Sequence, residues 1–202
     1  MAHVPTQVRS EQFIDAAVRI IAEQGVPRAT TRRIAEAADA PLASLHYCFR
    51  DKDGLFLAVF QHLADEAAST FASLEPAELE VTVTRLVEFM GRWVVEHPDY
   101  ALAQVDLYLW MARHRPALAA ESAEVYLRSV ADVLQRSAGP SVPADRIKAL
   151  ASVLAGVADG LVVQRAALRG QAHVDAYVAA FLPAVPGLCA RARGEESASD
   201  AS

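Results

Sequence analysis

A group of hydroxyl, basic and aromatic side chains between residues 30 and 52 has the chemistry to bind phosphates and base edges. Thr31, His46, Tyr47 and Lys52 are candidates for phosphate oxygens, and Ser44 is the candidate for a hydrogen bond to a base edge. The predicted chemistry is therefore binding, not catalysis. The whole candidate set is Thr30, Thr31, Arg32, Arg33, Leu42, Ala43, Ser44, His46, Tyr47 and Lys52.

Two short helical patterns must position these side chains. Apolar residues at positions 34, 35 and 38 form one stripe, those at 42, 45 and 49 form the next, and Asp39-Ala40-Pro41 separates them. This pattern predicts a helix-turn-helix over residues 30–49, whose second helix presents its outer side chains to a DNA groove. His46 and Tyr47 have an alternative role, which is to pack the end of that helix.

The same stretch resembles the DNA-binding domain of the tetracycline-repressor (TetR) family of transcriptional regulators, over roughly the first third of the chain. The matching residues are Gly25, Thr30, Thr31, Ile34, Ala35, Leu45, His46, Tyr47, Phe49, Lys52 and Leu55. Three positions depart from the usual pattern: His46 replaces a common tyrosine, Cys48 replaces a common histidine, and Ala40 replaces a valine that often follows a glycine, which is Asp39 here. The resemblance implies an operator-binding homodimer with a second domain that binds a small effector.

Composition favours an all-α chain with about nine helices. Hydrophobic residues make up 53% of the sequence and aromatic residues 7%, and Ala and Leu dominate. The net charge is −6, but residues 1–52 carry seven Lys/Arg against six Asp/Glu, so the amino-terminal part can approach a polyanion. Two cysteines and the lack of an apolar leader favour a cytoplasmic protein, with no membrane partner, cofactor or metal predicted.

The predicted domains are a DNA-binding domain at 7–67, an effector-binding and dimerisation domain at 77–193, and a disordered tail at 194–202. In addition to the two helices of the helix-turn-helix, the two domains are expected to contain helices at 10–24, 52–71, 77–96, 98–115, 116–138, 143–169 and 173–182. Pro183 and Pro186 are expected to break or kink the chain.

Aromatic and polar side chains of the second domain could line an apolar cavity for an effector. Gln104 and Asp106 lie on a predicted helix that has apolar residues on every side. Each polar side chain therefore needs a partner, either another group of the protein or a bound ligand. The alternative for each apolar member is a filled core. The predicted set is Phe89, Met90, Trp93, Gln104, Asp106, Tyr108, Trp110, Met111 and Tyr126.

Two late helices carry surplus apolar area, which favours a homodimer joined by a four-helix bundle over a pairing within one chain. Gly156 and Gly160 give the longest predicted helix a face of small residues that a second helix can approach closely. The predicted interface is Ala149, Ser152, Gly156, Gly160, Val163, Tyr177 and Phe181.

These features together predict a ligand-responsive transcriptional regulator, most simply a repressor released from its operator by a small hydrophobic effector. A DNA-binding activator, or a regulator with no ligand, is a second interpretation, which differs from the repressor in promoter geometry. The alternative from another class is an all-helical small-molecule-binding protein or enzyme without DNA binding, for which His97, His114 and Asp106 are the only candidates.

Overall fold

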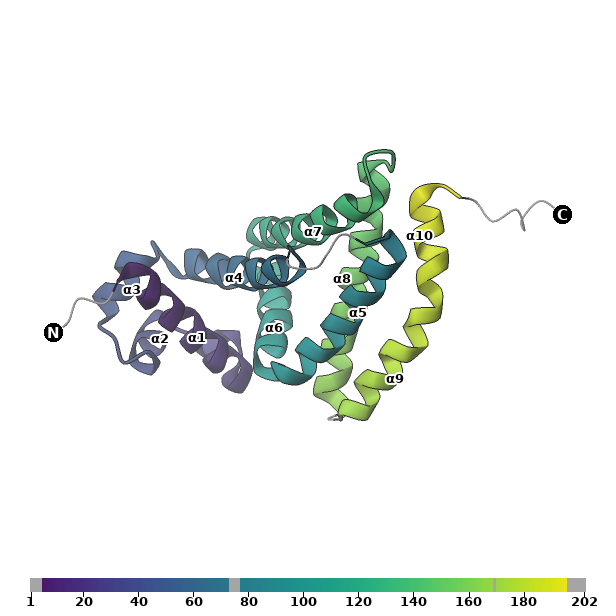
Figure 1. The fold of residues 1–202 in the computed structure, drawn as a ribbon. Coiled ribbons are helices and arrows are strands. Elements are labelled where there is room, and N and C mark those ends of the chain that lie inside the picture. The colour runs from purple at the N-terminus through teal and green to yellow at the C-terminus, as the bar shows by residue number, and fades with distance from the viewer. Residues whose placement is uncertain (1–4, 73–76, 169, 196–202) are drawn as a thin grey trace. The chain divides into compact units, whose positions relative to one another are not determined.

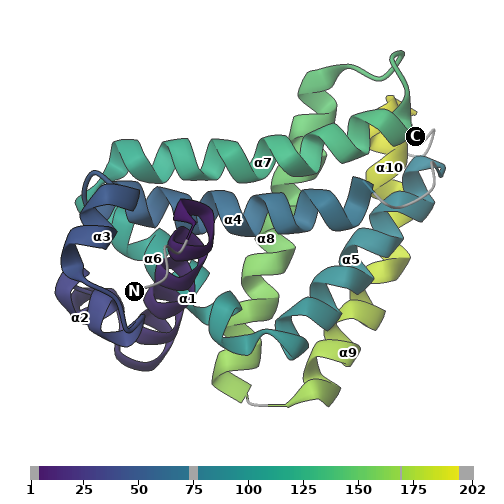
Figure 2. The same ribbon diagram turned by 60° about the vertical axis from the view of Figure 1, so that its left-hand side comes forward.

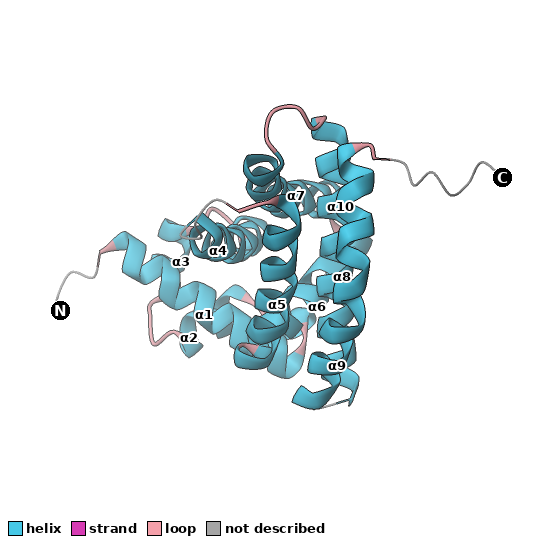
Figure 3. Ribbon diagram, turned by 45° about the vertical axis from the view of Figure 1, so that its right-hand side comes forward, coloured by secondary structure: helices cyan, strands magenta, loops and turns pink. Residues whose placement is uncertain are grey.

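The computed structural model describes residues 5–72, 77–168 and 170–195, and the side chains among them except those of residues 63–72. Every regular element in this part of the chain is a helix (Figures 1 and 3). The α-helices are α1 (Thr6–Gln24), α2 (Thr31–Ala37), α3 (Leu42–Cys48), α4 (Lys52–Ala72), α5 (Leu79–Glu96), α6 (Pro98–His114), α7 (Pro116–Ala138), α8 (Ala144–Leu168), α9 (Gln171–Phe181) and α10 (Val185–Arg193). Two 3₁₀ turns, η1 (Val26–Arg28) and η2 (Leu182–Ala184), precede α2 and α10.

The predicted all-α class is confirmed, with two differences in the elements. Helix α1 begins at Thr6, directly after Pro5, earlier than predicted, because its first turn is polar and carries no apolar stripe. Helix α9 ends at Phe181, just before the first of the two prolines that were expected to break or kink the chain, but the helix that follows them was not predicted. Pro183 lies in η2 and Pro186 in the first turn of α10, where a proline needs no backbone donor, so a further helix follows.

The chain forms two compact units. Unit 1 comprises the chain up to residue 63 together with residues 97–124, and unit 2 comprises residues 64–96 and those from 125 onward. Residues 97–124, placed by the sequence in the C-terminal domain, thus join the helix-turn-helix, because α6 packs along α1. Most of the predicted tail lies outside the described residues, and Gly194 and Glu195 follow the end of α10.

Unit 1 is built around α1, which packs against α2, α3 and α6 (Figure 2). Phe13, Ile34, Leu45 and Phe56 are among its fully buried side chains. The ring of Phe49 meets that of Phe13 edge to face, with centroids 6.3 Å apart. This core holds the two short helices, which are too short to be stable alone, at a fixed angle.

Unit 2 is a bundle in which α8 and α9 pack against α5, and α10 packs against α5 and α8. Its core includes Val87, Leu134, Leu154 and Cys189. Gly91 lies where α5 approaches α9 closely, since a Cβ there would come within 2.8 Å of Val178. Cys48 and Cys189 are both free thiols.

Candidate nucleic-acid interface

Helix α3 has one buried side and one exposed side. Leu45 is fully buried and anchors the helix in unit 1, whereas Tyr47 is 80% exposed and Leu42 38% exposed. Ala43 and His46 are also exposed, and Ser44 is half-buried. The structure therefore presents to solvent the side chains that the sequence assigned to the groove, and His46 and Tyr47 are not sealed inside the end of the helix.

The start of α2 is capped by Thr30. The Thr30 side-chain oxygen accepts a hydrogen bond from the backbone N–H of Arg33 at 3.3 Å, which satisfies one of the free donors of the helix. The guanidinium of Arg33 also donates to Gln24 at 2.6 Å, and that of Arg32 pairs with Glu36 at 3.1 Å. Both arginines remain on the surface side of α2, but each has a partner within unit 1.

The turn between α2 and α3 depends on Asp39. Its φ of 47° places it in the left-handed region, where aspartate is one of the few non-glycine residues tolerated. The departure from the family's glycine at this position therefore preserves the turn.

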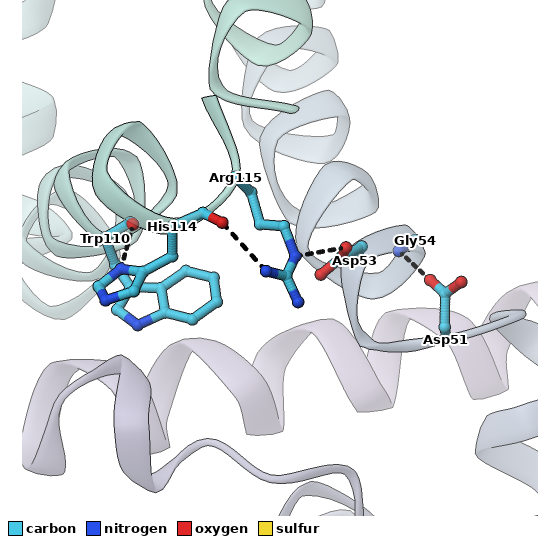
Figure 4. Close-up of polar contacts among 6 residues, drawn as sticks. All are labelled: Asp51, Asp53, Gly54, Trp110, His114 and Arg115. Carbon is cyan, nitrogen blue, oxygen red and sulfur yellow. Dashed lines mark hydrogen bonds and ion pairs between the residues drawn. The ribbon is translucent and has the colours of Figure 1, made fainter. Parts of the chain in front are cut away.

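The start of α4 is also capped. The Asp51 carboxylate accepts a hydrogen bond from the backbone N–H of Gly54 at 2.8 Å (Figure 4). This cap fixes the first residue of α4, Lys52, next to the helix-turn-helix.

The ammonium of Lys52 lies over two aromatic rings. Its Nζ is 4.8 Å from the centroid of the Phe56 ring and 5.4 Å from that of Trp110. Burial lowers the pKa of Lys52, an effect that the carboxylate of Asp53 opposes and the charge of Arg115 adds to. Sequence reasoning assigned Lys52 to phosphate but missed these rings. Only the i, i+4 spacing to Phe56 could have indicated one of them.

Polar contacts join the end of α6 to the start of α4, and Figure 4 shows them. The Arg115 guanidinium pairs with the Asp53 carboxylate at 3.0 Å, so the end of α6 is tied to the start of α4. The His114 ring stacks on the Trp110 indole, with centroids 4.9 Å apart and planes 21° apart. His114 Nδ1 also lies 2.8 Å from the backbone oxygen of Trp110.

Two hydrogen bonds connect α6 to η1 and α1. The Asp106 carboxylate accepts a hydrogen bond at 3.1 Å from the backbone N–H of Val26, the first residue of η1. The Tyr100 hydroxyl donates to the carboxylate of Asp15 on α1. Asp106, predicted to need a partner, has a backbone partner 80 residues away in sequence.

The predicted effector residues divide between the two units. Gln104, Asp106, Tyr108, Trp110 and Met111 belong to unit 1, where Met111 is fully buried and the rings of Tyr108 and Trp110 meet those of Phe60 and Phe56.

Phe89, Met90, Trp93 and Tyr126 belong to unit 2, where Met90 is a core residue and Phe89 and Tyr126 pack against the core. Burial, and secondarily the charge of Asp159, raises the pKa of the Tyr126 phenol, which stays protonated.

The predicted dimer residues form two groups, one exposed to solvent and one packed within the chain. Ala149, Ser152, Gly156 and Val163 are exposed along α8, and Val153 and Leu168 add apolar area there, 43% and 59% exposed. Tyr177 and Phe181, by contrast, pack against the core of unit 2, and a Cβ on Gly160 would lie 3.1 Å from the Tyr177 hydroxyl. The close approach at Gly160 is therefore made within the chain.

Two stretches, Ala144–Leu168 and Gln171–Arg193, are long and apolar enough to cross a membrane by length and composition. This is weak evidence, because a core helix of a soluble protein passes the same test. Among the described residues, no group of three or more His, Cys, Asp or Glu side chains is arranged to hold a metal ion.

Known proteins resemble this chain in sequence and fold. The profile of the family described as "Bacterial regulatory proteins, tetR family" matches residues 13–59, which includes α2 and α3. The nicotine-responsive transcriptional repressor HdnoR of Paenarthrobacter nicotinovorans is 31% identical over 113 residues, which cover 55% of this chain and 58% of that protein. The chain thus spans just over half the length of HdnoR.

Two further similarities extend over most of the chain. The HTH-type transcriptional regulator BetI of Burkholderia mallei (strain NCTC 10229) is 27% identical over 170 residues, covering 82% of this chain and 85% of that one. The crystal structure described as a putative TetR-family transcriptional regulator from Rhodococcus sp. matches the fold with a TM-score of 0.70 at 18% identity, covering 90% of this chain and 99% of that one.

Proposed function

We infer that this chain is a member of the tetR family of bacterial regulatory proteins and a DNA-binding transcriptional regulator, which represses by occupying an operator until a small effector releases it. The observation that carries this proposal is the solvent-exposed outer side of α3, with Leu45 buried behind it. Such a helix can enter a major groove without any rearrangement of unit 1.

The proposed contacts follow from the position of each side chain. Thr31, His46, Tyr47 and Lys52 would contact phosphates, with Arg32 and Arg33 beside them, while Thr30 acts through its cap on α2. Ser44 would bond to a base edge, and Leu42 and Ala43 would contact groups such as a thymine methyl. A recognition helix with one polar base-facing side chain implies modest direct readout of sequence.

The proposed assembly is a cytoplasmic homodimer that binds double-stranded DNA. Helix-turn-helix units usually read two half-sites about one DNA turn apart, which requires two copies. The exposed small and apolar side chains of α8 support a contact with a second copy. Membrane insertion of α8 is the weaker explanation, because the curated relatives are transcriptional regulators.

The proposed effector is a small, largely hydrophobic molecule. The relative HdnoR is responsive to nicotine, a ring-containing organic amine, and unit 2 of this chain offers partly buried rings at Phe89 and Tyr126. Nicotine is therefore a suitable first probe, since release of operator DNA on its addition would identify the effector class. An enzyme is the alternative from another class, but the relatives are regulators.

A mobility-shift assay on the DNA upstream of the chain's own coding region tests the proposal. We expect binding whose affinity falls steeply with salt, and a loss of roughly tenfold for Tyr47→Ala or Lys52→Ala, because each removes a phosphate contact. The matched control is Val81→Ala, an exposed position on α5 that belongs neither to the proposed DNA contacts nor to the proposed dimer contact. Undiminished binding by both variants would refute these contacts, and no binding by the wild-type protein to any upstream duplex would refute the function.

A further inference from the structure

We propose that Trp110 restrains DNA binding, because its indole and the ring of Phe56 compete with a DNA phosphate for the Lys52 ammonium. The ammonium thus has two competing partners, the aromatic pair and the phosphate. This inference rests on the proposed function, since the second partner is operator DNA.

The geometry of the aromatic pair suits an ammonium. Both ring centroids lie within 6 Å of Lys52 Nζ, the range of an attractive cation–π contact. The two rings are 5.8 Å apart with planes at 84°, so they form a corner with the ammonium against both. Phe56 is fully buried, so the surrounding core holds its ring in place.

Trp110 is the adjustable member of the pair. It lies on α6, whereas Lys52 and Phe56 lie on α4. The stacked ring of His114 supports its indole, and the Arg115–Asp53 ion pair holds the end of α6 next to the start of α4 (Figure 4). The position of the indole over Lys52 therefore depends on how α6 lies against α4 within unit 1.

The electrostatics explain why the rings matter. The neighbouring carboxylate, Asp53, is paired with Arg115, and Lys52 forms no ion pair with any residue in the described part of the chain. Lys52 is half-buried, so its ammonium has lost part of its water. A phosphate offers a full negative charge, but reaching it means giving up the two rings.

A double-mutant cycle on the wild type's operator duplex tests the competition. Trp110→Leu should tighten DNA binding by about two- to fivefold, because it removes one ring face that competes for the ammonium. In the Lys52→Met background, the same change should leave affinity unaltered. Trp110→Phe, which retains a ring, should have a smaller effect than Trp110→Leu. Thermal unfolding of each variant serves as the folding control.

A second readout does not depend on Trp110→Leu folding. The chain has two tryptophans, so Trp93→Phe leaves Trp110 as the only one. In that background, Lys52→Met should shift the Trp110 emission, and saturating operator DNA should produce a shift of the same sign.

Three results would overturn the inference. They are weaker DNA binding by Trp110→Leu, an equal effect of Trp110→Leu with and without Lys52, and Trp110 emission that is unchanged by Lys52→Met. Each of these leaves the proposed function standing as long as the wild-type protein binds its operator. Failure of the wild type to bind any upstream duplex would instead refute the function first and the inference with it.

Discussion

At the scale of single residues, Thr30 was assigned to DNA contact, but in the structure its side chain stabilises the start of α2. Its oxygen accepts from the Arg33 N–H, so its contribution is to the start of α2. Asp39 has a comparable role, since it adopts the left-handed conformation that the turn requires. Such residues affect DNA affinity indirectly, through the angle between two short helices.

Thr30→Ala should destabilise the protein by about 1 kcal/mol, the usual cost of losing a helix cap. Thr30→Ser keeps the acceptor oxygen and should stay close to the wild type. Urea unfolding of the two variants measures the difference. An equal loss in both would mean that the methyl group of Thr30, and not its oxygen, stabilises α2.

At the scale of elements, α6 is the helix whose role in unit 1 depends most on distant residues. It packs along α1, and Asp106 reaches the backbone of Val26 at the turn before α2. The Val26 side chain is fully buried, so loss of the carboxylate would leave its N–H with little access to water. The link makes the fold of the helix-turn-helix dependent on a helix from later in the chain.

Asp106→Ala should therefore lower the stability of the protein by about 1 to 3 kcal/mol, the range for a buried donor without a partner. Asp106→Asn retains an acceptor oxygen and should cost less. Chemical denaturation followed by circular dichroism compares the variants. If Asp106→Ala unfolds like the wild type, the hydrogen bond to Val26 does not stabilise unit 1.

At the scale of the whole molecule, the charge distribution supports the proposed orientation on DNA. Residues 1–52 carry a small positive excess, whereas the remaining 150 carry twelve Lys/Arg against nineteen Asp/Glu. The acidic part is repelled by phosphate, which favours approach through α2 and α3. The exposed side of α8 is the proposed contact with a second copy.

Gly156→Leu should weaken the dimer by at least about tenfold, because a leucine would separate two closely packed helices. Within one chain the change is tolerated, since a Cβ at Gly156 meets nothing within 4 Å. Gly187→Leu on α10 is the matched control, because Gly187 is also an exposed helical glycine with open space around it. Sedimentation at several concentrations provides the measurement, and a Gly156→Leu dimer of unchanged strength would contradict the interface at α8.

The sequence by itself determined the features that depend on near neighbours. Apolar spacing identified α2 and α3, and the buried Leu45 among exposed neighbours followed from helical periodicity. These features could be predicted because a helix and its caps are set by residues within about four positions of one another.

Only the tertiary structure decided which distant residues meet. The bond from Val26 to Asp106, the Trp110 ring over Lys52 and the packing of α6 in unit 1 join residues far apart in the chain, and no local periodicity encodes them. Helix α10 was missed because a proline signals a break in sequence, although it fits in the first turn of a helix. Local patterns specify elements, but the contacts between elements depend on the shape and burial of the whole unit.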